Sequence, residues 1–497
     1  MTPSLDDVRA LSSRLRPEFL EEQRLLPLRI DDDAAHVGTW GAPARPDALW
    51  QLESLLGKRV RLEPVDEDAA RHAIRRVYGE ASARSLIDAM GGSSPRDIAG
   101  DEPAIDDLRA LANEVPVIRL VSLLLTEALA ARASDVHLEA YPDALRIRYR
   151  VDGVLEDAPS PPPAMARAIV SRLKVMADLD IAERRVPQDG RIRLVLQDRQ
   201  VDVRVATVPT LHGESLVLRL LDRAGGQLEL ASLGMSPDVL QQLLGVLARP
   251  HGVVLATGPT GSGKTTTLYA ALAHLRTGRE KIVTVEDPVE YQLAGVPQVP
   301  VNERAGVTFA SALRALLRQD PDVLLVGEIR DGETADIATQ AALTGHLVLS
   351  TLHTNDAAGA ITRLVDLGVA PFLVAATVEA VLAQRLVRTV CEACAADVPA
   401  TEVERTALGD PLLTTIRRGA GCDACRGSGY VGRTGVHELL VITEEMRDAI
   451  TNGAAVERVR ALASAGGMRT LAHDAARLAR EGRTTPEEAL RIGRERA

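Results

Sequence analysis

Aromatic side chains are scarce in this chain, since Phe, Trp and Tyr together make up 2% of its 497 residues. Proteins that hold single-stranded nucleic acid stack its bases on such side chains, and few are available here. An excess of positive charge is also missing, because the formal net charge is −11 at pH 7. The composition therefore disfavours a nucleic-acid-binding protein and leaves Leu, Val, Ile and Ala to build the hydrophobic cores.

Long uncharged hydrophobic runs are absent as well. The longest apolar stretches, such as Val117–Ala131, are interrupted by charged residues, here Arg119 and Glu127. None of them is predicted to span a bilayer, which takes about 20 predominantly apolar residues. Residues 1–7 have neither the basic start nor the apolar core of a signal peptide. We therefore expect a cytoplasmic protein that reaches a membrane only through a partner.

Cysteine is rare too, but its spacing is informative. Residues 395–421, 27 in all, separate two Cys-x-x-Cys pairs. The four cysteines are Cys391, Cys394, Cys422 and Cys425. Two such pairs fit a zinc site with four cysteine ligands, although the loop between them exceeds the usual spacing. A redox role is less consistent with two copies, and because no histidine or open ligand position is implied, we predict a structural Zn²⁺.

The sequence does contain a complete phosphate-binding loop. Residues 258–265 read GPTGSGKT and match the pattern G-x-x-x-x-G-K-[ST] at all eight positions. A short apolar strand is predicted before the loop at 253–256 and a helix after it at 265–275, which is the order that such a loop requires. Glycines let backbone N–H groups turn toward the phosphates, and the helix N-terminus adds partial positive charge. We therefore predict binding of ATP or GTP.

Individual roles follow from the same loop. Lys264 would reach the β- and γ-phosphates, and the Thr265 hydroxyl would ligate Mg²⁺. A chance glycine-rich loop is the competing interpretation, and the full match between strand and helix argues against it. The predicted nucleotide-binding residues are Gly258, Pro259, Thr260, Gly261, Ser262, Gly263, Lys264, Thr265 and Thr266.

Two later strands end in carboxylates. Residues 281–290 read KIVTVEDPVE, and residues 322–331 read DVLLVGEIRD. Because α/β proteins place ligands at the carboxyl ends of their parallel strands, these acids are candidates for the nucleotide site. Glu328 is predicted to help hold Mg²⁺, and Glu290 to orient or activate the attacking water. Either acid alone could be a surface carboxylate, but the phosphate-binding loop favours the catalytic interpretation.

A third strand is predicted within residues 344–355, with His346 and His353 at its two ends. A single histidine is more often structural or on the surface. Two histidines that flank one strand could instead sense the γ-phosphate or link the site to a neighbouring subunit. We include His353 among the candidate catalytic residues.

The pattern of elements divides the chain into three domains. Residues 1–87 are predicted to form a small α+β domain without a chemical motif, followed by a linker at 88–104 that is rich in Gly, Ser and Pro. Residues 105–225 are predicted to be a second α+β domain with an antiparallel sheet, because several segments alternate apolar and polar residues. Residues 226–497 alternate apolar strands with helices, which predicts an α/β fold with a mostly parallel, RecA-like sheet.

Individual elements are predicted from apolar spacing and turn residues. The third domain would carry the zinc subdomain at 388–432 and a helical tail from Thr443. In the second domain, the predicted elements are a helix at 115–132 and strands at 145–153, 201–205 and 215–220. In the first domain, they are strands at 26–30 and 60–63 and helices at 47–56 and 68–78.

Taken together, these motifs resemble the secretion ATPases of the type II/type IV pilus superfamily, from about residue 105 to about residue 490. The resemblance rests on ASDVHLE at 133–139, the phosphate-binding loop, EDPVE at 286–290, and VGEIRD at 326–331 with the histidine box ending at His353. The run from Ala177 to Arg191 is similar to the family as well. The resemblance implies two flexibly joined domains on a hexameric ring, the first of them PAS-like, and an N-terminal domain that docks the cytoplasmic domain of an inner-membrane secretion protein.

The resemblance also implies roles that the residues alone leave open. Arg204 and Arg219 match the arginines that reach the nucleotide from the second domain in this family. Taken by themselves, they lie on adjacent predicted strands and could equally be surface charges. The paired cysteines resemble those of assembly-type members and set the chain apart from the retraction ATPases, which lack them.

The single short N-terminal domain is more similar to that of a type II secretion ATPase than to the longer one of a pilus extension ATPase. The predicted function is therefore hydrolysis of ATP to drive pseudopilus assembly and protein export. The protein would be peripheral at the inner membrane, with acidic lipid as a further contact. The alternative is a type IV pilus extension ATPase. A nucleic-acid translocase is disfavoured by the composition, and a scaffold that only binds ATP is disfavoured by Glu290 and Glu328.

Overall fold

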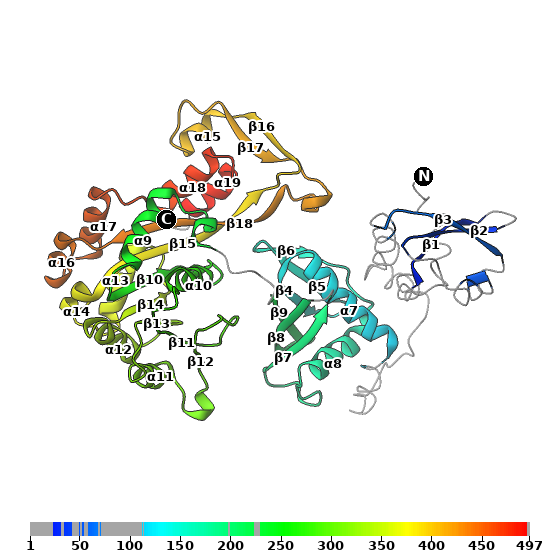
Figure 1. Ribbon diagram of the computed structural model, residues 1–497, viewed down its shortest axis with the longest axis horizontal. Coiled ribbons are helices and arrows are strands. Elements are labelled where there is room, and N and C mark those ends of the chain that lie inside the picture. Colours follow the sequence, from blue (N-terminus) through cyan, green and yellow to red (C-terminus); the bar gives the residue numbers. More distant parts are fainter. Residues whose placement is uncertain are drawn as a thin grey trace. The chain divides into compact units, whose positions relative to one another are not determined.

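A computed structural model describes residues 23–30, 34–41, 58–67, 114–196, 199–222 and 229–494, together with residues 49, 52, 53, 70 and 112. The chain divides into two compact units, Met1–Asp222 and Arg223–Ala497, which are described separately below (Figure 1). Apart from single residues, the helices predicted at 47–56 and 68–78 lie outside the described residues. The predicted linker at 88–104 lies outside them entirely.

The first unit begins with a three-stranded sheet in the order β1-β2-β3. β1 (Leu25–Ile30) pairs antiparallel with β2 (Ala34–Thr39), and β2 pairs parallel with β3 (Arg59–Pro64). β1 and β3 confirm the two strands predicted here, whereas β2 was not predicted. Its sequence AAHVGT contains Ala and Gly, which are depleted in strands, and buried residues occupy both of its faces, so it has no alternating pattern.

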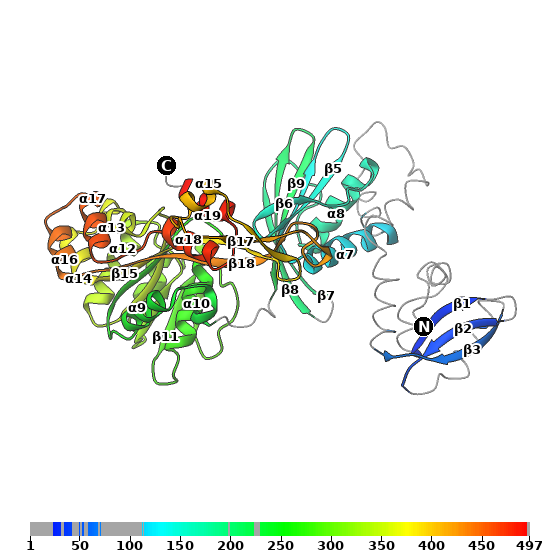
Figure 2. The ribbon, with the colours of Figure 1, turned by 90° about the horizontal axis from the view of Figure 1, so that it is seen from above.

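A six-stranded sheet follows in the first unit, in the order β6-β5-β4-β9-β8-β7. Every pair in it is antiparallel, which confirms the predicted antiparallel sheet. Helices α7 and α8 lie on the same side of it in both views (Figures 1 and 2). The bounds are α7 (Val115–Ala130), β4 (Ala133–Ala140), β5 (Leu145–Val151), β6 (Val154–Asp157), α8 (Ala166–Met176), β7 (Gln188–Leu196), β8 (Arg199–Thr210) and β9 (Gly213–Asp222).

The amphipathic patterns explain how the helices of this domain pack against its sheet. Leu120, Leu124 and Ala128 recur every four residues on one face of α7, and all three are buried. In β8, Val203 and Val205 are buried, and the residues that alternate with them point to the other face of the sheet. The apolar face of the sheet and the two helices therefore share one core.

The second unit is built on a seven-stranded sheet in the order β12-β11-β13-β14-β10-β15-β18. All neighbours in it pair in parallel except β15 and β18, which are antiparallel, so the predicted mostly parallel sheet is confirmed. The strands are β10 (Gly252–Thr257), β11 (Ile282–Glu286), β12 (Gln298–Pro300), β13 (Val323–Val326), β14 (Leu347–Leu352), β15 (Val378–Val390) and β18 (Tyr430–Val441).

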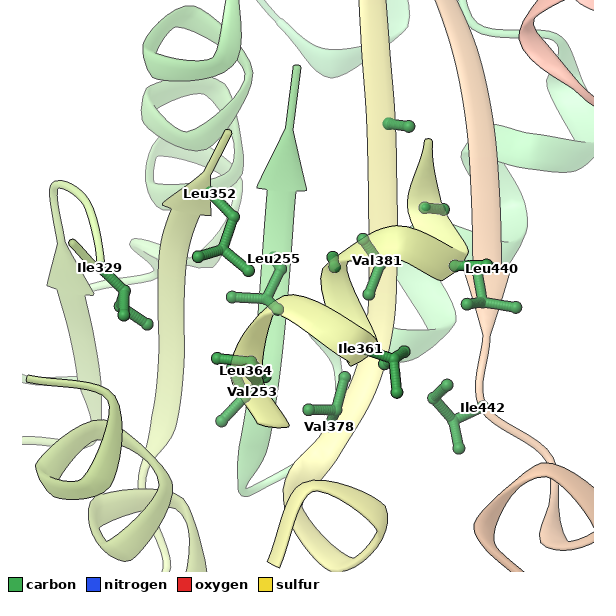
Figure 3. Packing of buried hydrophobic residues seen from close by; sticks show 14 of the residues in the cluster. Val253, Leu255, Ile329, Leu352, Ile361, Leu364, Val378, Val381, Leu440 and Ile442 are labelled. Carbon is green, nitrogen blue, oxygen red and sulfur yellow. The ribbon is translucent and has the colours of Figure 1, made fainter. Parts of the chain in front are cut away.

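Helices cover both faces of this sheet. Val253 and Leu255 of β10 belong to one core, and Val254 and Ala256 belong to the other, which is why the strand is apolar throughout. Figure 3 shows the first core, which contains Leu255 of β10 and Leu364 of α13. The helices of this unit are α9 (Pro237–Leu247), α10 (Lys264–Leu275), α11 (Phe309–Leu316), α12 (Gly332–Leu343), α13 (Ala357–Asp366), α14 (Pro371–Thr377), α15 (Glu402–Ala407), α16 (Glu444–Thr451), α17 (Val456–Ala465), α18 (Leu471–Arg480) and α19 (Pro486–Arg494).

The cysteine-bearing segment is an excursion between two paired strands. The sequence predicts an insertion at 388–432 and a helical tail from Thr443, and between them β18 returns the chain to the sheet beside β15. The excursion holds β16 (Ala395–Pro399), α15 and β17 (Thr415–Gly419), and the two strands pair antiparallel. The helical tail then begins at α16, whose N-terminus is capped by the Thr443 side chain. In the part of the chain that the structure describes, no helix combines the length and apolarity that crossing a bilayer requires.

Candidate functional site

The phosphate-binding loop joins β10 to α10, as the sequence predicts. Gly258, Gly261 and Gly263 have φ angles of 147°, 78° and 87°, a region of backbone conformation that strains residues with a Cβ atom. Helix α10 begins at Lys264, so the loop ends at a helix N-terminus on the carboxyl edge of the sheet. The local backbone therefore has the conformation that a phosphate cradle needs.

Gln384 of β15 braces this loop, and the sequence analysis missed it. Its amide Oε1 accepts a hydrogen bond from the Thr267 hydroxyl at 2.7 Å, and its Nε2 donates to the backbone oxygen of Ser262 at 2.8 Å. A Cβ atom at Gly263 would lie 2.7 Å from that Nε2, so a larger residue would displace the Gln384 amide, and the φ angle of 87° favours glycine here as well. The signal that could have indicated Gln384 is an uncharged polar residue directly after the apolar run at 380–383 of β15.

Lys264 lies inside the loop that precedes it. Its Nζ donates to the backbone oxygens of Gly258 at 2.6 Å and Pro259 at 3.1 Å. Burial lowers the pKa of Lys264 to about 8, the positive charge of Arg385 acts in the same direction, and the negative charge of Glu328 opposes both. This ammonium group would gain stabilisation from a neighbouring anion.

A second polar atom of the loop also fits a phosphate. The hydroxyl oxygen of Ser262 is buried and has no hydrogen-bond partner in the described part of the chain. Leaving a buried hydroxyl unpaired costs about 1–3 kcal/mol, which a phosphate oxygen at the loop would recover. The residues present therefore fit a nucleotide phosphate group.

Glu328 and His353 meet beside Lys264. Glu328 follows β13, and its Oε2 lies 3.6 Å from Nε2 of His353, which follows β14. Burial and the charge of Lys264 lower the pKa of His353 below its usual value, which favours the neutral imidazole at pH 7. Thr354 ties this segment to the end of β10, because its backbone N–H donates to the Thr257 hydroxyl at 2.9 Å.

His346 lies at the other edge of the sheet. It precedes β14, and its backbone oxygen accepts a hydrogen bond from Gly252, the first residue of β10, at 3.1 Å. The phosphate-binding loop follows the last residue of β10, so the parallel pairing separates His346 from it by the length of the strand. Of the two histidines that flank this strand, His353 is the one at the candidate nucleotide site.

The acid at the end of β11 and the acid beyond it have different environments. Glu286 is 3% exposed and accepts hydrogen bonds from the Thr284 hydroxyl at 2.5 Å, from Gln298 at 3.1 Å and from the Tyr269 hydroxyl. Glu290 lies beyond the strand, four residues after Glu286. Glu286 is thus a buried structural acceptor, and the role of Glu290 in orienting water stays a prediction.

Arg204 and Arg219 belong to the first unit. They lie directly opposite each other on β8 and β9, on the face of the sheet that the helices leave uncovered. Like charges in that position are unfavourable, and Asp135 of β4 compensates by binding Nε of Arg219 at 3.0 Å. Half of the Arg219 side chain, 52%, is exposed. The proposed contact of these arginines with nucleotide stays a prediction.

The four cysteines converge on one point in the second unit. Their sulfur atoms all lie within 4.8 Å of one another. Three of the separations are 3.9 Å between Cys391 and Cys422, 3.8 Å between Cys394 and Cys425, and 3.7 Å between Cys422 and Cys425. A tetrahedral zinc ion with Zn–S bonds of about 2.3 Å has sulfur atoms about 3.8 Å apart, so the donor set fits Zn²⁺.

Backbone N–H groups support the same sulfur atoms. Gly429 and Cys422 donate to the sulfur of Cys425 at 3.2 Å and 3.0 Å, and Gly421 donates to that of Cys394 at 3.3 Å. Burial acts to raise the pKa of Cys425, but the N–H groups of Cys422 and Gly429 and the neighbouring Cys422 and Cys394 thiols outweigh it and lower the pKa to about 6. Burial raises the pKa of Cys394 to about 12, so Cys425 is the more readily deprotonated thiol of these two. Such donors stabilise the thiolate, which is the form that binds a metal ion.

The chain matches two known family models and is similar to several known proteins. Residues 110–491 match the family described as type II/IV secretion system protein, and residues 3–84 match the MshEN domain. Type II secretion system protein HxcR of Pseudomonas aeruginosa is 50% identical over 436 residues, which cover 87% of this chain and 90% of the relative. Type II secretion system protein E of the same organism is 46% identical over an alignment of 507 residues, which covers 100% of both chains. Type II secretion system ATPase E of Vibrio cholerae is 44% identical over 466 residues, 91% of each.

Solved structures give the same fold. The crystal structure of the pilus retraction motor PilT with bound ADP is 26% identical with a TM-score of 0.51, covering 75% of this chain and 96% of that one. The ATPase DotB of Legionella pneumophila is 21% identical with a TM-score of 0.57, covering 80% of this chain and 98% of that one. Both likenesses support the predicted RecA-like core behind an α+β domain.

Proposed function

This chain belongs to the family of type II/IV secretion system proteins, and from that premise we propose that it hydrolyses ATP to drive pseudopilus assembly and protein export by a type II secretion system. The observation that carries the proposal is the meeting of Lys264, Glu328 and His353 at the carboxyl edge of one parallel sheet. Phosphoryl transfer needs little covalent chemistry from a protein, so charges that are held in place at such an edge can supply most of the catalysis.

Each group has a proposed task. The loop and Lys264 would bind the phosphates, and the Thr265 hydroxyl together with Glu328 would hold Mg²⁺, which would supply further positive charge. Glu290 would orient the attacking water, and the neutral imidazole of His353 would donate a hydrogen bond to the γ-phosphate. Zn²⁺ would be held by the four cysteines as a structural ion, because all four positions of a tetrahedral site are filled by the chain.

The direct test is ATP turnover by the purified full chain. It is measured alone, with the cytoplasmic domain of a candidate inner-membrane secretion protein, and with that domain on vesicles of acidic lipid. We expect hydrolysis that depends on Mg²⁺ and rises in the presence of both additions. Absence of hydrolysis under all three conditions, from protein that still binds ATP, would identify a nucleotide-binding scaffold instead.

The alternative is extension of a type IV pilus, and the relatives named type II secretion system protein E favour secretion over it. Deleting the gene should abolish export of folded proteins and leave surface pili intact. Loss of pili with normal export would reverse the assignment.

We also propose that the active form is a hexamer in which Arg204 and Arg219 reach a nucleotide. Their pairing on the sheet face that α7 and α8 leave uncovered, with half of the Arg219 side chain exposed, supports a role beyond packing. The rate of ATP turnover should then increase more than in proportion to protein concentration. Arg204→Ala or Arg219→Ala should lower turnover without unfolding the protein. Turnover that stays proportional to concentration, with both variants fully active, would favour a self-sufficient monomer.

The N-terminal domain, residues 1–87, would dock the cytoplasmic domain of an inner-membrane protein and so keep the motor at the membrane. Such tethering raises the local concentration of the ring without any new contact to the nucleotide site. Trp40 and Trp50 are the only tryptophans, so indole fluorescence reports on this domain alone. The partner should shift that emission and ATP should not. If a chain without residues 1–87 still reached the membrane through the partner, the docking surface would lie elsewhere.

A further inference from the structure

A buried polar cluster lies between helix α10 and strand β11 in the second unit. At its centre is Glu286, the last residue of β11, which is 3% exposed. A buried carboxylate is costly unless donors surround it, and here it accepts from the Thr284 hydroxyl at 2.5 Å, Gln298 at 3.1 Å and the Tyr269 hydroxyl. The fold therefore keeps an acid in its core by providing three donors from α10, β11 and β12.

Tyr269 connects this cluster to the segment that carries Glu290. The Tyr269 side chain is 1% exposed, and its hydroxyl donates to Glu286 while it accepts from Nε2 of Gln298 at 3.3 Å. One hydroxyl can do both, because it carries one donor and two acceptor sites. Its ring also packs edge-on against the ring of Tyr291, with 4.5 Å between the centroids.

Gln298 of β12 holds the same segment from the other side. Its Nε2 donates to Glu286 at 3.1 Å and to the backbone oxygen of Tyr291 at 3.2 Å. Its Oε1 accepts from the backbone N–H of Leu293 at 2.7 Å. Residues 286–293 are thus attached at their start, middle and end to two side chains that lie outside the segment.

We propose that Tyr269 and Gln298 are positioning residues for the ATP hydrolysis proposed above, on which this inference rests. They would hold residues 286–293 so that the Glu290 carboxylate keeps one place relative to α10. That helix begins with Lys264, and Tyr269 lies about 7.5 Å farther along it at a rise of about 1.5 Å per residue. Helix α10, whose first residue Lys264 would bind the phosphates, would thereby also fix the position of the Glu290 carboxylate, which would orient water.

The position of the Glu290 carboxylate should have a measurable effect on turnover. A misplacement of about 1 Å in a reacting group can lower turnover about 100-fold. Burial and the charge of Glu286 raise the pKa of Tyr269 far above its usual range, so its hydroxyl stays a donor at every pH at which the protein would be assayed. The effect of removing that hydroxyl should therefore be the same across neutral and mildly alkaline pH.

The test compares two tyrosines that differ by their hydroxyl contacts. Tyr269→Phe removes the hydroxyl that joins Glu286 and Gln298, and Tyr291→Phe is the matched control that keeps the edge-on ring pair. In the full chain we expect Tyr269→Phe to lower kcat about 10- to 100-fold, with the Kd for ADP within about twofold of wild type. Tyr291→Phe should keep kcat within about twofold.

A double variant separates positioning from general packing. If Tyr269 acts through Glu290, then Tyr269→Phe combined with Glu290→Gln should turn over no more slowly than Glu290→Gln alone, because the group being positioned is already lost. If kcat of the double variant falls by the product of the two single fold-losses, the proposal is overturned. Equal kcat for Tyr269→Phe and Tyr291→Phe would overturn it as well.

A second variant covers the case in which Tyr269→Phe lowers the thermal midpoint. Gln298→Leu removes the side-chain hydrogen bonds that Gln298 of β12 makes to residues 286–293, and it should also lower kcat. Combined with Glu290→Gln, it should turn over no more slowly than Glu290→Gln alone. A wild-type chain without turnover would overturn the proposed function and this inference together. A wild-type chain with normal turnover, and with both brace variants unaffected, would overturn this inference alone.

Discussion

The two candidate sites of the second unit are built in opposite ways. The cysteine site takes all of its ligands from one excursion of the chain, residues 391–429, and its supporting N–H donors come from the same segment. The nucleotide site draws on residues that follow β10, β13 and β14, and its loop is braced from β15 by Gln384, which is 117 positions from its partner Thr267. A local site depends on short-range spacing, whereas a distributed site depends on the order of strands in the sheet.

The comparison predicts that single changes are most damaging in the distributed site, and the largest effect is expected at Lys264. Lys264→Ala removes the cation nearest the phosphates and should lower kcat/KM for ATP about 100- to 1,000-fold. Steady-state turnover measures it. Lys281→Ala, a change of an exposed lysine in the same unit, is the matched control and should leave turnover within about twofold. Equal activity of the two variants would contradict the assignment of the loop.

The next largest effect is expected at the two carboxylates. Glu328→Gln and Glu290→Gln keep the shape of the side chain and remove its charge, so each should lower kcat about 100-fold or more while ATP still binds. Glu445→Gln on the exposed face of α16 serves as the control. Hydrolysis at the wild-type rate by both site variants would show that other groups handle Mg²⁺ and water.

A smaller effect is expected from pH. The pKa of Lys264 is lowered to about 8 by burial, and bound phosphate would raise it again. ATP affinity should therefore be constant below pH 8 and should fall as pH rises above it, by at most about tenfold per pH unit, because binding then requires proton uptake. Binding titrations at several pH values measure it, and AMP, which lacks the β- and γ-phosphates, should show no such trend. A flat ATP profile up to pH 9.5 would mean that Lys264 is not the main phosphate contact.

The smallest effect on hydrolysis is expected at the cysteines. Native protein should carry about one zinc ion per chain, and Cys391→Ser or Cys422→Ser should lose it together with about 5 °C or more of thermal midpoint. Turnover of the folded fraction should stay within about twofold, because the cluster lies outside the parallel strands that carry the nucleotide site. Elemental analysis and calorimetry measure both. Loss of turnover without loss of the fold would show that the two sites are coupled.

The same contrast explains which features were predictable. The phosphate-binding loop and the paired cysteines are recognisable because each one needs particular residues at fixed short distances along the chain. The alternating strands of the first unit and the apolar strands of the second follow from burial on one face or on both. Strand β2 escaped prediction because buried Ala, His and Gly residues carry no periodic signal.

By itself, the sequence determined the phosphate-binding loop, the cysteine pairs and the alternation of apolar strands with helices, because backbone conformation and ligand spacing act over a few residues. Only the tertiary structure decided that His353 joins Glu328 while His346 lies at the opposite edge, since that outcome depends on the parallel pairing of β14 with β10. It also decided that Gln384 braces the loop and that Glu286 is enclosed by donors from three elements. The Gln384 contacts join positions 117 and 122 residues apart, and the Glu286 contacts join three separate elements. The free energy of burying polar groups selects such contacts only once the sheet has formed.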